Sequence, residues 1–281
     1  MTKRIVAVPG LGVVPADHPV LRGDDLGVLR GDGVFETLHV RQGRPWLLAE
    51  HLDRMARSAR ALDLDLPRRD ELEELVATAC AAWPEAEEGA LRLVCTRGPE
   101  PGGPPTVYAT VAPVPEDLRR SRRDGVAVVT ATLGFAAGAR RDAPWLLGGA
   151  KSLSYAVNMA SLRWARRRGA DEVLWTSTDG YALEGPTSSL VWLDGTVMCT
   201  VPPEATGVLA GTTVRWLLDH ADELGFTAEE RMVTPAQLRS AAGVWFTSSV
   251  RGCAPVRELD GVPLSPSPHT PAIHDLLGHP R

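Results

Sequence analysis

Residues 151–189 read KSLSYAVNMASLRWARRRGADEVLWTSTDGYALEGPTSS and contain the residues that decide the fold and chemistry of this chain. Residues 152–168 predict a helix that ends in three arginines and Gly169, a residue type that often terminates helices. A strand and an Asp-Gly turn follow. Lys151 stands at the start of the predicted helix, and Glu184 comes after the turn.

Lysine is nearly absent from the chain, which draws attention to Lys151. The only other lysine is Lys3, although lysine and arginine together number 30. Arginine stays protonated, whereas a buried lysine can lose its proton and form a Schiff base. The alternative explanation is that a G+C-rich genome replaced lysine with arginine and that Lys151 remains by chance. Composition alone therefore leaves two alternatives open, and the surrounding motifs must decide between them.

Composition indicates a globular protein and excludes several classes. The chain has 281 residues, of which 44% are hydrophobic and 23% charged, enough for one large core or two modest ones. A net charge of −5 argues against a nucleic-acid partner. No apolar stretch approaches the roughly 18 residues of a membrane span. The dispersed cysteines indicate a reducing, cytoplasmic setting and no metal site; they are Cys80, Cys95, Cys199 and Cys253.

Strand and helix patterns alternate and predict a two-part α/β chain. A strand at 34–40 and a helix at 50–62 are examples from the first part. We expect an N-terminal α/β domain over 1–114, a charged linker over 115–124 and a C-terminal domain over 125–281. The proline-containing tail after Pro263 is expected to be only partly ordered.

Further motifs suit the binding of an anion. His51 and Arg54 lie on one helix face, although such a pair is also typical of an exposed surface. Hydroxyl residues at a helix start or tight turn can bind an anion together with backbone N–H groups, although each is also typical of a plain cap. The hydroxyl residues in question are Thr212 and Thr213, and Thr247, Ser248 and Ser249.

Taken together, the motifs fit one cofactor. A Schiff-base lysine, a carboxylate for a heteroaromatic ring nitrogen and a phosphate-binding set are what pyridoxal 5′-phosphate requires. Lys151 supplies the amine and Glu184 the carboxylate. Because the parts are chemically complementary, their joint occurrence by chance is less expected than that of any single motif.

The chain resembles the fold-type IV (class IV) aminotransferase superfamily from about Leu21 to Val262. This superfamily includes branched-chain aminotransferases, D-amino-acid aminotransferases and 4-amino-4-deoxychorismate lyases. The resemblance is strongest to the lyase branch, particularly its actinobacterial-type members. The segments that carry it occur in the family's order: RGDGVFETL, HLDRMARSA, KSLSYAVNMA, GADEVLWTSTDGYALEG, GVLAGTT and SSVRGCAPV.

The resemblance implies a role for each matching residue. Lys151 matches the lysine bonded to the cofactor, Glu184 the carboxylate on the pyridine nitrogen, and Arg54 the phosphate-binding arginine. Tyr155 lies near the position of a tyrosine beside the cofactor's phenolic oxygen, with the spacing one residue shorter. The residues matching the phosphate-binding turns are Thr212, Thr213, Ser248 and Ser249.

Departures from the family pattern concern the substrate side. The family usually has Ser-Asn where this chain has Ser188-Ser189. Arg97 matches an arginine that binds a substrate carboxylate in D-amino-acid aminotransferases, but the histidine that accompanies it there is missing. Arg30 precedes Gly-Asp-Gly, where many aminotransferases carry another residue. Arg97 and Arg30 are therefore the candidates for binding a substrate with two carboxylates.

The resemblance also implies an architecture and an activity. The expected fold is a small N-terminal α/β domain and a larger C-terminal pseudo-barrel domain, with the cofactor between them, in a homodimer. The expected reaction on the small-molecule substrate aminodeoxychorismate gives 4-aminobenzoate and pyruvate in folate biosynthesis. The alternatives are a transaminase for D-amino or branched-chain amino acids, and a non-enzymatic phosphate or nucleotide binder.

Overall fold

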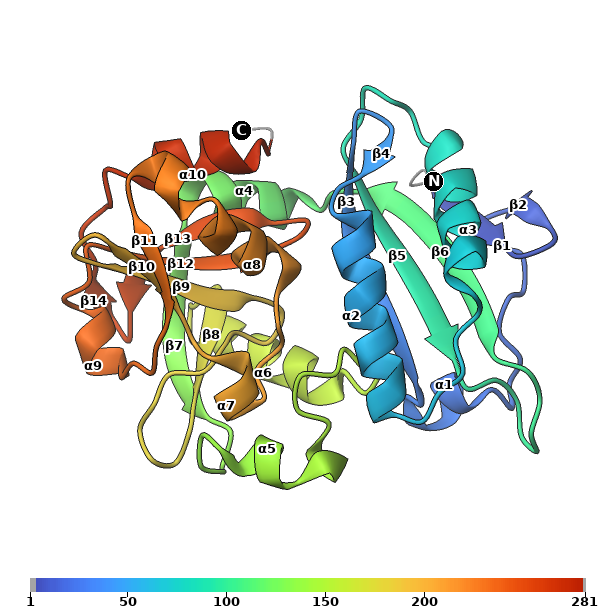
Figure 1. Cartoon of the computed structure of the whole chain (residues 1–281), viewed down its shortest axis with the longest axis horizontal. Coiled ribbons are helices and arrows are strands. Elements are labelled where there is room, and N and C mark those ends of the chain that lie inside the picture. The colour runs from blue at the N-terminus through green and yellow to red at the C-terminus, as the bar shows by residue number, and fades with distance from the viewer. Residues whose placement is uncertain (1–3, 280–281) are drawn as a thin grey trace. The chain divides into compact units, whose positions relative to one another are not determined.

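The computed structural model describes residues 4–279, so Lys3 lies outside the described residues. The chain divides into two compact units (Figure 1). The first ends at Pro115 and also takes in Ala150–Tyr155. The second comprises Glu116–Gly149 and the described chain from Ala156 onward. Each unit has its own sheet and its own hydrophobic core.

The first unit is built on a six-stranded sheet in the order β2-β1-β6-β5-β3-β4, in which every neighbouring pair is antiparallel. Its strands are β1 (Ile5–Val8), β2 (Gly12–Val14), β3 (Gly33–Arg41), β4 (Arg44–Pro45), β5 (Gly89–Thr96) and β6 (Thr106–Pro113). Its helices are α1 (Leu26–Arg30), α2 (Leu48–Ala61) and α3 (Arg69–Ala81).

Helix α2 follows the periodicity read from the sequence. Leu52, Met55 and Ala59, which share one helical stripe, are all buried in the core of the first unit. The neighbouring strand β3 is buried along most of its length. Burial of apolar area on this scale supplies most of the driving force for folding. Helix α2 therefore presents its apolar stripe to the sheet, and the same buried face also carries His51 and Arg54.

Lys151 lies in an extended segment that joins β3, which corrects the predicted helix over 152–168. The Phe35 amide donates to the Lys151 carbonyl at 3.1 Å, and the Leu153 amide donates to the Gly33 carbonyl at 2.8 Å. Strand β4 pairs only with the far end of β3, so this stretch of edge is open for pairing. Backbone groups used in a strand-like ladder are not available to a helix, so α6 begins only at Ala156.

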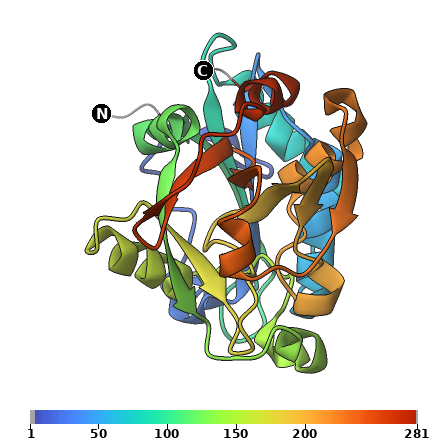
Figure 2. The ribbon, with the colours of Figure 1, turned by 90° about the vertical axis from the view of Figure 1, so that its left-hand side faces the viewer.

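The second unit contains an eight-stranded sheet in the order β11-β10-β9-β12-β13-β7-β8, with β14 paired to β13 (Figure 2). Its strands are β7 (Val126–Thr132), β8 (Glu172–Thr176), β9 (Ser189–Asp194), β10 (Val197–Thr200), β11 (Thr227–Glu230), β12 (Gly243–Ser248), β13 (Gly252–Leu259) and β14 (Val262–Pro263). The β7–β8, β7–β13 and β10–β11 pairs are parallel.

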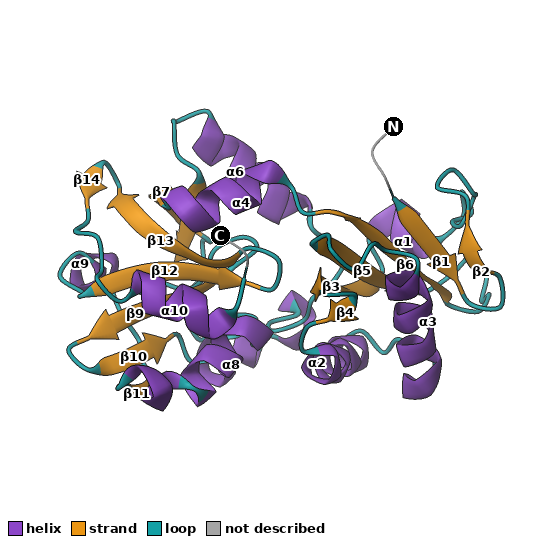
Figure 3. Ribbon diagram, turned by 90° about the horizontal axis from the view of Figure 1, so that it is seen from above, coloured by secondary structure: helices purple, strands orange, loops and turns teal. Residues whose placement is uncertain are grey.

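Helices and short 3₁₀ turns accompany this sheet (Figure 3). They are α4 (Glu116–Asp124), α5 (Ala139–Asp142), η1 (Pro144–Leu146), α6 (Ala156–Arg166), α7 (Pro203–Thr206), α8 (Thr212–Asp219), η2 (Ala221–Leu224), α9 (Pro235–Leu238) and α10 (Thr270–Leu277).

Two segments are more ordered than the sequence predicted. The expected linker 115–124 forms helix α4, which packs against β13 and buries Arg122. The tail after Pro263 contains α10, which buries Ile273 and Leu277. The sequence of α4 is mostly charged, and its one buried residue is an arginine. The sequence of α10 is flanked by prolines and has only two buried apolar residues, spaced four apart. Neither pattern predicts a packed helix.

Other expectations from composition can be compared with the described chain. All four cysteines are buried and free. Within residues 4–279, no helix is long and apolar enough to cross a membrane. The same residues hold no cluster of His, Cys, Asp and Glu suited to a metal ion.

Candidate active site

The side-chain nitrogen of Lys151 lies against two aromatic rings of the first unit. Its Nζ atom is 4.5 Å from the centroid of the Phe35 ring and 5.6 Å from that of Tyr155. The two rings meet edge to face with centroids 5.2 Å apart. Ser58 Oγ accepts a hydrogen bond from the Lys151 amide at 3.0 Å. The backbone is therefore anchored, and the amine is half-buried in aromatic surroundings that suit a nucleophile.

Arg54 is held by a buried carboxylate on the neighbouring strand. Its Nε and Nη2 atoms donate to the two oxygens of Glu36 at 2.8 and 2.6 Å. His51 Nδ1 lies 2.6 Å from Glu36 Oε2. An ionised carboxylate can only accept hydrogen bonds, so His51 Nδ1–H is assigned as the donor in that bond. The helix pair His51 and Arg54 is thus part of a buried cluster and is not an exposed surface pair.

Electrostatics fix the charge of this cluster. Burial by itself would raise the pKa of Glu36, but the charge and hydrogen bonds of Arg54, with help from His51, hold that pKa well below its usual range. Burial lowers the pKa of His51, and the charges of Arg54 and Lys151 lower it further, against the opposing effect of Glu36. At neutral pH, Glu36 is ionised and His51 is neutral.

Glu184 occupies a buried position in the second unit. The Leu209 amide donates to its Oε2 at 3.0 Å, and Arg140 Nη1 donates to its Oε1 at 3.3 Å. Arg140 Nη1 also lies 3.2 Å from the Gly207 carbonyl. The Trp175 amide donates to the Glu184 carbonyl at 2.9 Å, which extends the pairing of β8. The carboxylate is therefore fixed by main chain and by one cation.

The predicted phosphate-binding segments contain buried hydroxyls that fit an anion. Within residues 4–279, Thr213 Oγ1 and Thr247 Oγ1 are buried without a hydrogen-bond partner. Helix α8, which begins at Thr212, has Gly211 as its N-cap and no side-chain cap. Buried polar atoms nearly always have partners, so an unpartnered hydroxyl beside an uncapped helix start fits a bound anion. Thr247 belongs to the same predicted motif as Ser248 and Ser249.

Arg97 and Arg30, the predicted substrate-carboxylate residues, both contact Asp32. Arg97 donates through Nε to Asp32 Oδ2 at 2.9 Å and through Nη2 to the Leu62 carbonyl at 2.6 Å. Arg30 Nη2 donates to the same Asp32 oxygen at 3.2 Å, and its side chain is 56% exposed. Arg97 thus ties the end of β5 to the end of α2, while Arg30 is the more accessible cation.

Ser188, at which this chain departs from the family pattern, contacts a second buried ion pair. Its hydroxyl lies 3.4 Å from Glu172 Oε2, which also accepts from Arg251 Nη1 at 2.7 Å. Glu172 is fully buried and Arg251 is 6% exposed. The serine therefore takes part in a hydrogen-bond network behind the turn that follows β12.

The structure groups the predicted residues by unit. Lys151, Arg54 and Tyr155 belong to the first unit; those of the second are Glu184, Thr212, Thr213, Ser248 and Ser249. Sequence reasoning missed Glu36, although a carboxylate in an apolar strand requires a cationic partner, which the His-x-x-Arg helix supplies. It also missed Arg140, which lies in a loose stretch without any pattern to single it out.

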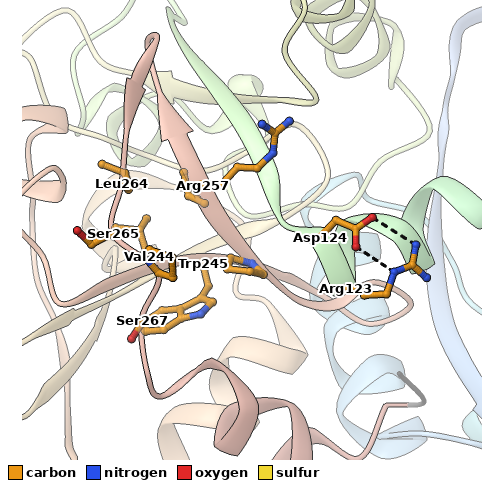
Figure 4. Close-up of a pocket in the computed structure, with 11 residues that line it drawn as sticks. Arg123, Asp124, Val244, Trp245, Arg257, Leu264, Ser265 and Ser267 are labelled. Atoms are coloured by element: carbon orange, nitrogen blue, oxygen red, sulfur yellow. Dashed lines mark hydrogen bonds and ion pairs between the residues drawn. The ribbon is translucent and has the colours of Figure 1, made fainter.

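One further pocket lies in the second unit, and it contains none of the predicted site residues (Figure 4). Its volume is about 220 Å³ and its lining includes Trp245, Val244 and Ser267. Arg123 and Asp124 form an ion pair of 2.9 Å at its edge. Neither Lys151 nor Glu184 lines this pocket.

An amine beside aromatic rings, a buried carboxylate and unpartnered hydroxyls are features that a pyridoxal-phosphate enzyme uses. The model of the amino-transferase class IV family matches residues 33–259. The chain belongs to this family, whose members are PLP-dependent enzymes acting on small molecules. The predicted family and fold class are confirmed.

Relatives with assigned activities and known structures support this membership. The chain is 42% identical over 267 residues to a bifunctional aminodeoxychorismate lyase / D-amino acid transaminase of Mycobacterium tuberculosis, covering 92% of each protein. It is also similar to two solved structures of a hypothetical aminotransferase from that organism, at 41% identity and covering 98% of this chain. One, with α-ketoglutarate and PMP bound, has a TM-score of 0.95 and 97% of its chain covered. The PLP-bound form has a TM-score of 0.93 and 98% covered.

Proposed function

We propose that this enzyme is a PLP-dependent 4-amino-4-deoxychorismate lyase that forms 4-aminobenzoate and pyruvate. The observation that carries the proposal is the 42% identity, over 92% of both chains, to an enzyme named for this lyase activity. The placement of Lys151 against Phe35 and Tyr155 supports it, because a proton-transferring amine needs a fixed position.

Residues of this chain supply each contact that the cofactor needs. We propose that Lys151 bonds to pyridoxal phosphate and that Glu184 accepts a hydrogen bond from its protonated ring nitrogen. Arg54 and the hydroxyl turns bind the phosphate; those turns contain Thr212, Thr213, Ser248 and Ser249. When bound, the cofactor supplies an electron sink for the carbanion at the reacting carbon. Tyr155, beside Lys151, is assigned to the phenolic side of the ring.

Lys151 is the residue that moves protons in this proposal. Its amine removes the C4 proton of the substrate, and the resulting ammonium returns a proton as the enolpyruvyl group leaves from C3. Aromatisation of the ring drives the reaction, so the protein mainly has to position the substrate and shuttle protons. Arg30 and Arg97 are assigned to the substrate carboxylates, and the greater exposure of Arg30 makes it the first to test.

Transamination is the second candidate function. The same M. tuberculosis relative is named for D-amino acid transamination as well, and a similar solved structure holds α-ketoglutarate and PMP. In this reaction Lys151 would take the proton from the α-carbon of a D-amino or branched-chain amino acid. The cofactor machinery would be the same, and only the substrate contacts would differ.

One assay separates the two candidates. Purified enzyme is given aminodeoxychorismate without any keto acid, and 4-aminobenzoate and pyruvate are measured. We expect both products in equal amounts. Turnover only with an amino acid and α-ketoglutarate together would refute the lyase proposal and support transamination.

A second experiment tests the role of Lys151. We expect a yellow protein whose colour disappears with borohydride and whose cofactor mass is then found on the peptide containing Lys151. Lys151→Ala should abolish turnover and labelling while leaving the circular dichroism unchanged. Lys3→Ala, at the only other lysine, is the matched control. A colourless wild-type protein that stays colourless with added cofactor would instead favour the non-enzymatic alternative.

The setting of the enzyme is also proposed from its family resemblance. We expect a homodimer in the cytoplasm, with no nucleic-acid or membrane partner. Sedimentation of the purified holoenzyme at several concentrations tests the dimer, and a monomer at all of them would contradict it.

A further inference from the structure

The hairpin turn between β12 and β13 is buried and needs partners for its backbone. It consists of Ser249, Val250 and Arg251, and each of these residues is less than a tenth exposed. Loops generally run over the surface because buried backbone polar groups are costly without hydrogen bonds. The turn therefore requires side chains from elsewhere in the second unit.

Two side chains distant in sequence take up all three carbonyl oxygens of the turn. His279 Nε2 donates to the Ser249 carbonyl at 2.9 Å. Arg122 donates through Nη2 to the Val250 carbonyl at 2.9 Å and through Nε to the Arg251 carbonyl at 3.0 Å. The guanidinium of Arg122 comes from α4, and His279 follows α10, two helices that both pack against β13 (Figure 1).

These contacts determine where the amides of the turn point. In a trans peptide the N–H lies on the side opposite the preceding C=O. The amides of Val250 and Arg251 are therefore directed away from Arg122 and His279. Across the described chain, no hydrogen-bond acceptor is found for either amide. Two adjacent N–H groups held without partners are what an anion-binding turn presents.

The side chain of Arg251 braces the turn further. Its Nη1 atom is bound to the buried Glu172 at 2.7 Å. Gly252, which follows, has φ +73°, and a Cβ there would come within 2.9 Å of the His279 ring. The turn is thus fixed on the carbonyl side, at the arginine side chain and at the glycine.

We propose that Arg122 and His279 are positioning residues that hold the Ser249–Arg251 turn in the conformation that binds the cofactor's phosphate. The inference rests on the proposed function, because it takes Ser248 and Ser249 as phosphate ligands. Arg122 acts through the backbone: its cation orients and polarises the peptide groups whose amides face the anion. This gives helix α4 a role in cofactor binding.

The test compares affinity for pyridoxal phosphate with affinity for pyridoxal, which lacks the phosphate. The variants are Arg122→Gln, which loses the charged donors, and Arg122→Lys, which keeps one. Arg123→Gln, at the exposed neighbouring arginine on the same helix, is the matched control. Dissociation constants are measured by absorbance on the full-length protein.

We expect Arg122→Gln to weaken binding of pyridoxal phosphate by about 10-fold or more, as for loss of a charge-assisted hydrogen bond. Pyridoxal should be affected by less than about 2-fold, since the altered donors would act only through the phosphate. Arg122→Lys should show an intermediate preference for pyridoxal phosphate over pyridoxal. Arg123→Gln should show the same preference as the wild type.

An unchanged preference for the phosphorylated form in both Arg122 variants would overturn the inference, as would an equal loss for the two ligands. If circular dichroism shows that Arg122→Gln does not fold, the inference is tested with Arg122→Lys and His279→Gln, using the same ratio of the dissociation constants for pyridoxal and pyridoxal phosphate. A wild-type protein with no preference for pyridoxal phosphate would refute the proposed function itself, which distinguishes the two failures.

Discussion

Two buried carboxylate–arginine pairs, one in each unit, use the same chemistry in different ways. Glu36 receives two N–H groups of Arg54 and one of His51, so both its oxygens are occupied. Glu172 receives only Nη1 of Arg251 among that arginine's nitrogens, and Arg251 Nε is buried without a partner in the described chain. We call the first pair the closed pair because Arg54 donates two hydrogen bonds to one carboxylate. We call the second the open pair because Arg251 Nε has no hydrogen-bond partner in the described chain.

The two pairs position different groups. A guanidinium that donates two parallel bonds to one carboxylate has a fixed plane, so Glu36 sets the orientation of Arg54. Arg251 is held at one nitrogen, while its carbonyl is held by Arg122. Glu172 therefore anchors a backbone turn. Buried ion pairs are weak sources of net stability, so orientation is the better account of both.

The largest effect is expected when the closed pair is broken. Glu36→Gln removes the charge facing Arg54 and should lower the free energy of unfolding by about 3–5 kcal/mol, as for breaking a buried ion pair. Denaturant unfolding of the cofactor-free protein measures it. Glu73→Gln, at an exposed carboxylate paired with Arg69, is the control and should cost less than about 1 kcal/mol.

The open pair should cost less to break. Glu172→Gln should lower the free energy of unfolding by about 2 kcal/mol, because one charge-assisted bond is lost and the hydroxyl of Ser188 can still be bonded. The same denaturant series measures it. A cost equal to that of Glu36→Gln would show that the two pairs do not differ in the way their contacts indicate.

Unpartnered hydroxyls sharpen the contrast between saturated and unsaturated sites. Thr213→Val should stabilise the cofactor-free protein by about 1 kcal/mol, because it removes a buried hydroxyl that has no partner in the described chain. It should weaken binding of pyridoxal phosphate. Thr96→Val is the matched change at a hydroxyl bonded to Asp25 at 2.9 Å, and should destabilise. Thermal unfolding with and without cofactor measures both, and destabilisation by Thr213→Val would contradict the assignment.

The smallest effect concerns pH and the closed pair. Burial lowers the pKa of His51 from 6.5, so its contribution to stability is complete above that value and declines as the pH falls towards the folded-state pKa. Between about pH 7 and about pH 5.5 this residue should account for at most about 1 kcal/mol of lost stability. In a plot of the free energy of unfolding against pH, His51→Gln should reduce the decrease between these two pH values by this amount. A steeper curve in the variant would mean that the imidazole is protonated in the folded state.

The sequence predicted elements with strong local periodicity and failed where distant contacts decide. The apolar stripe of α2 and the presence of strand β3 follow from residue spacing. The extended conformation at Lys151 depends on the open edge of β3, and the helix at 116–124 depends on carbonyl groups near residue 250. No local pattern records such partners. Likewise Lys151 and Glu184 were predicted as site residues from motif chemistry, whereas the contacts of Arg140 and Arg122 could be identified only in the structure.

The return of Ala150–Tyr155 to the first unit has a consequence for synthesis of the protein. Domains begin to fold while the chain is still being made, N-terminal part first. The first unit cannot be completed on that schedule, because its last piece is translated after Glu116–Gly149 of the second. Part of the second unit is therefore synthesised before the first unit is complete. Lys151 is added at that closing step, so a nascent chain that stops short of it contains the buried cluster of Glu36, His51 and Arg54 without Lys151.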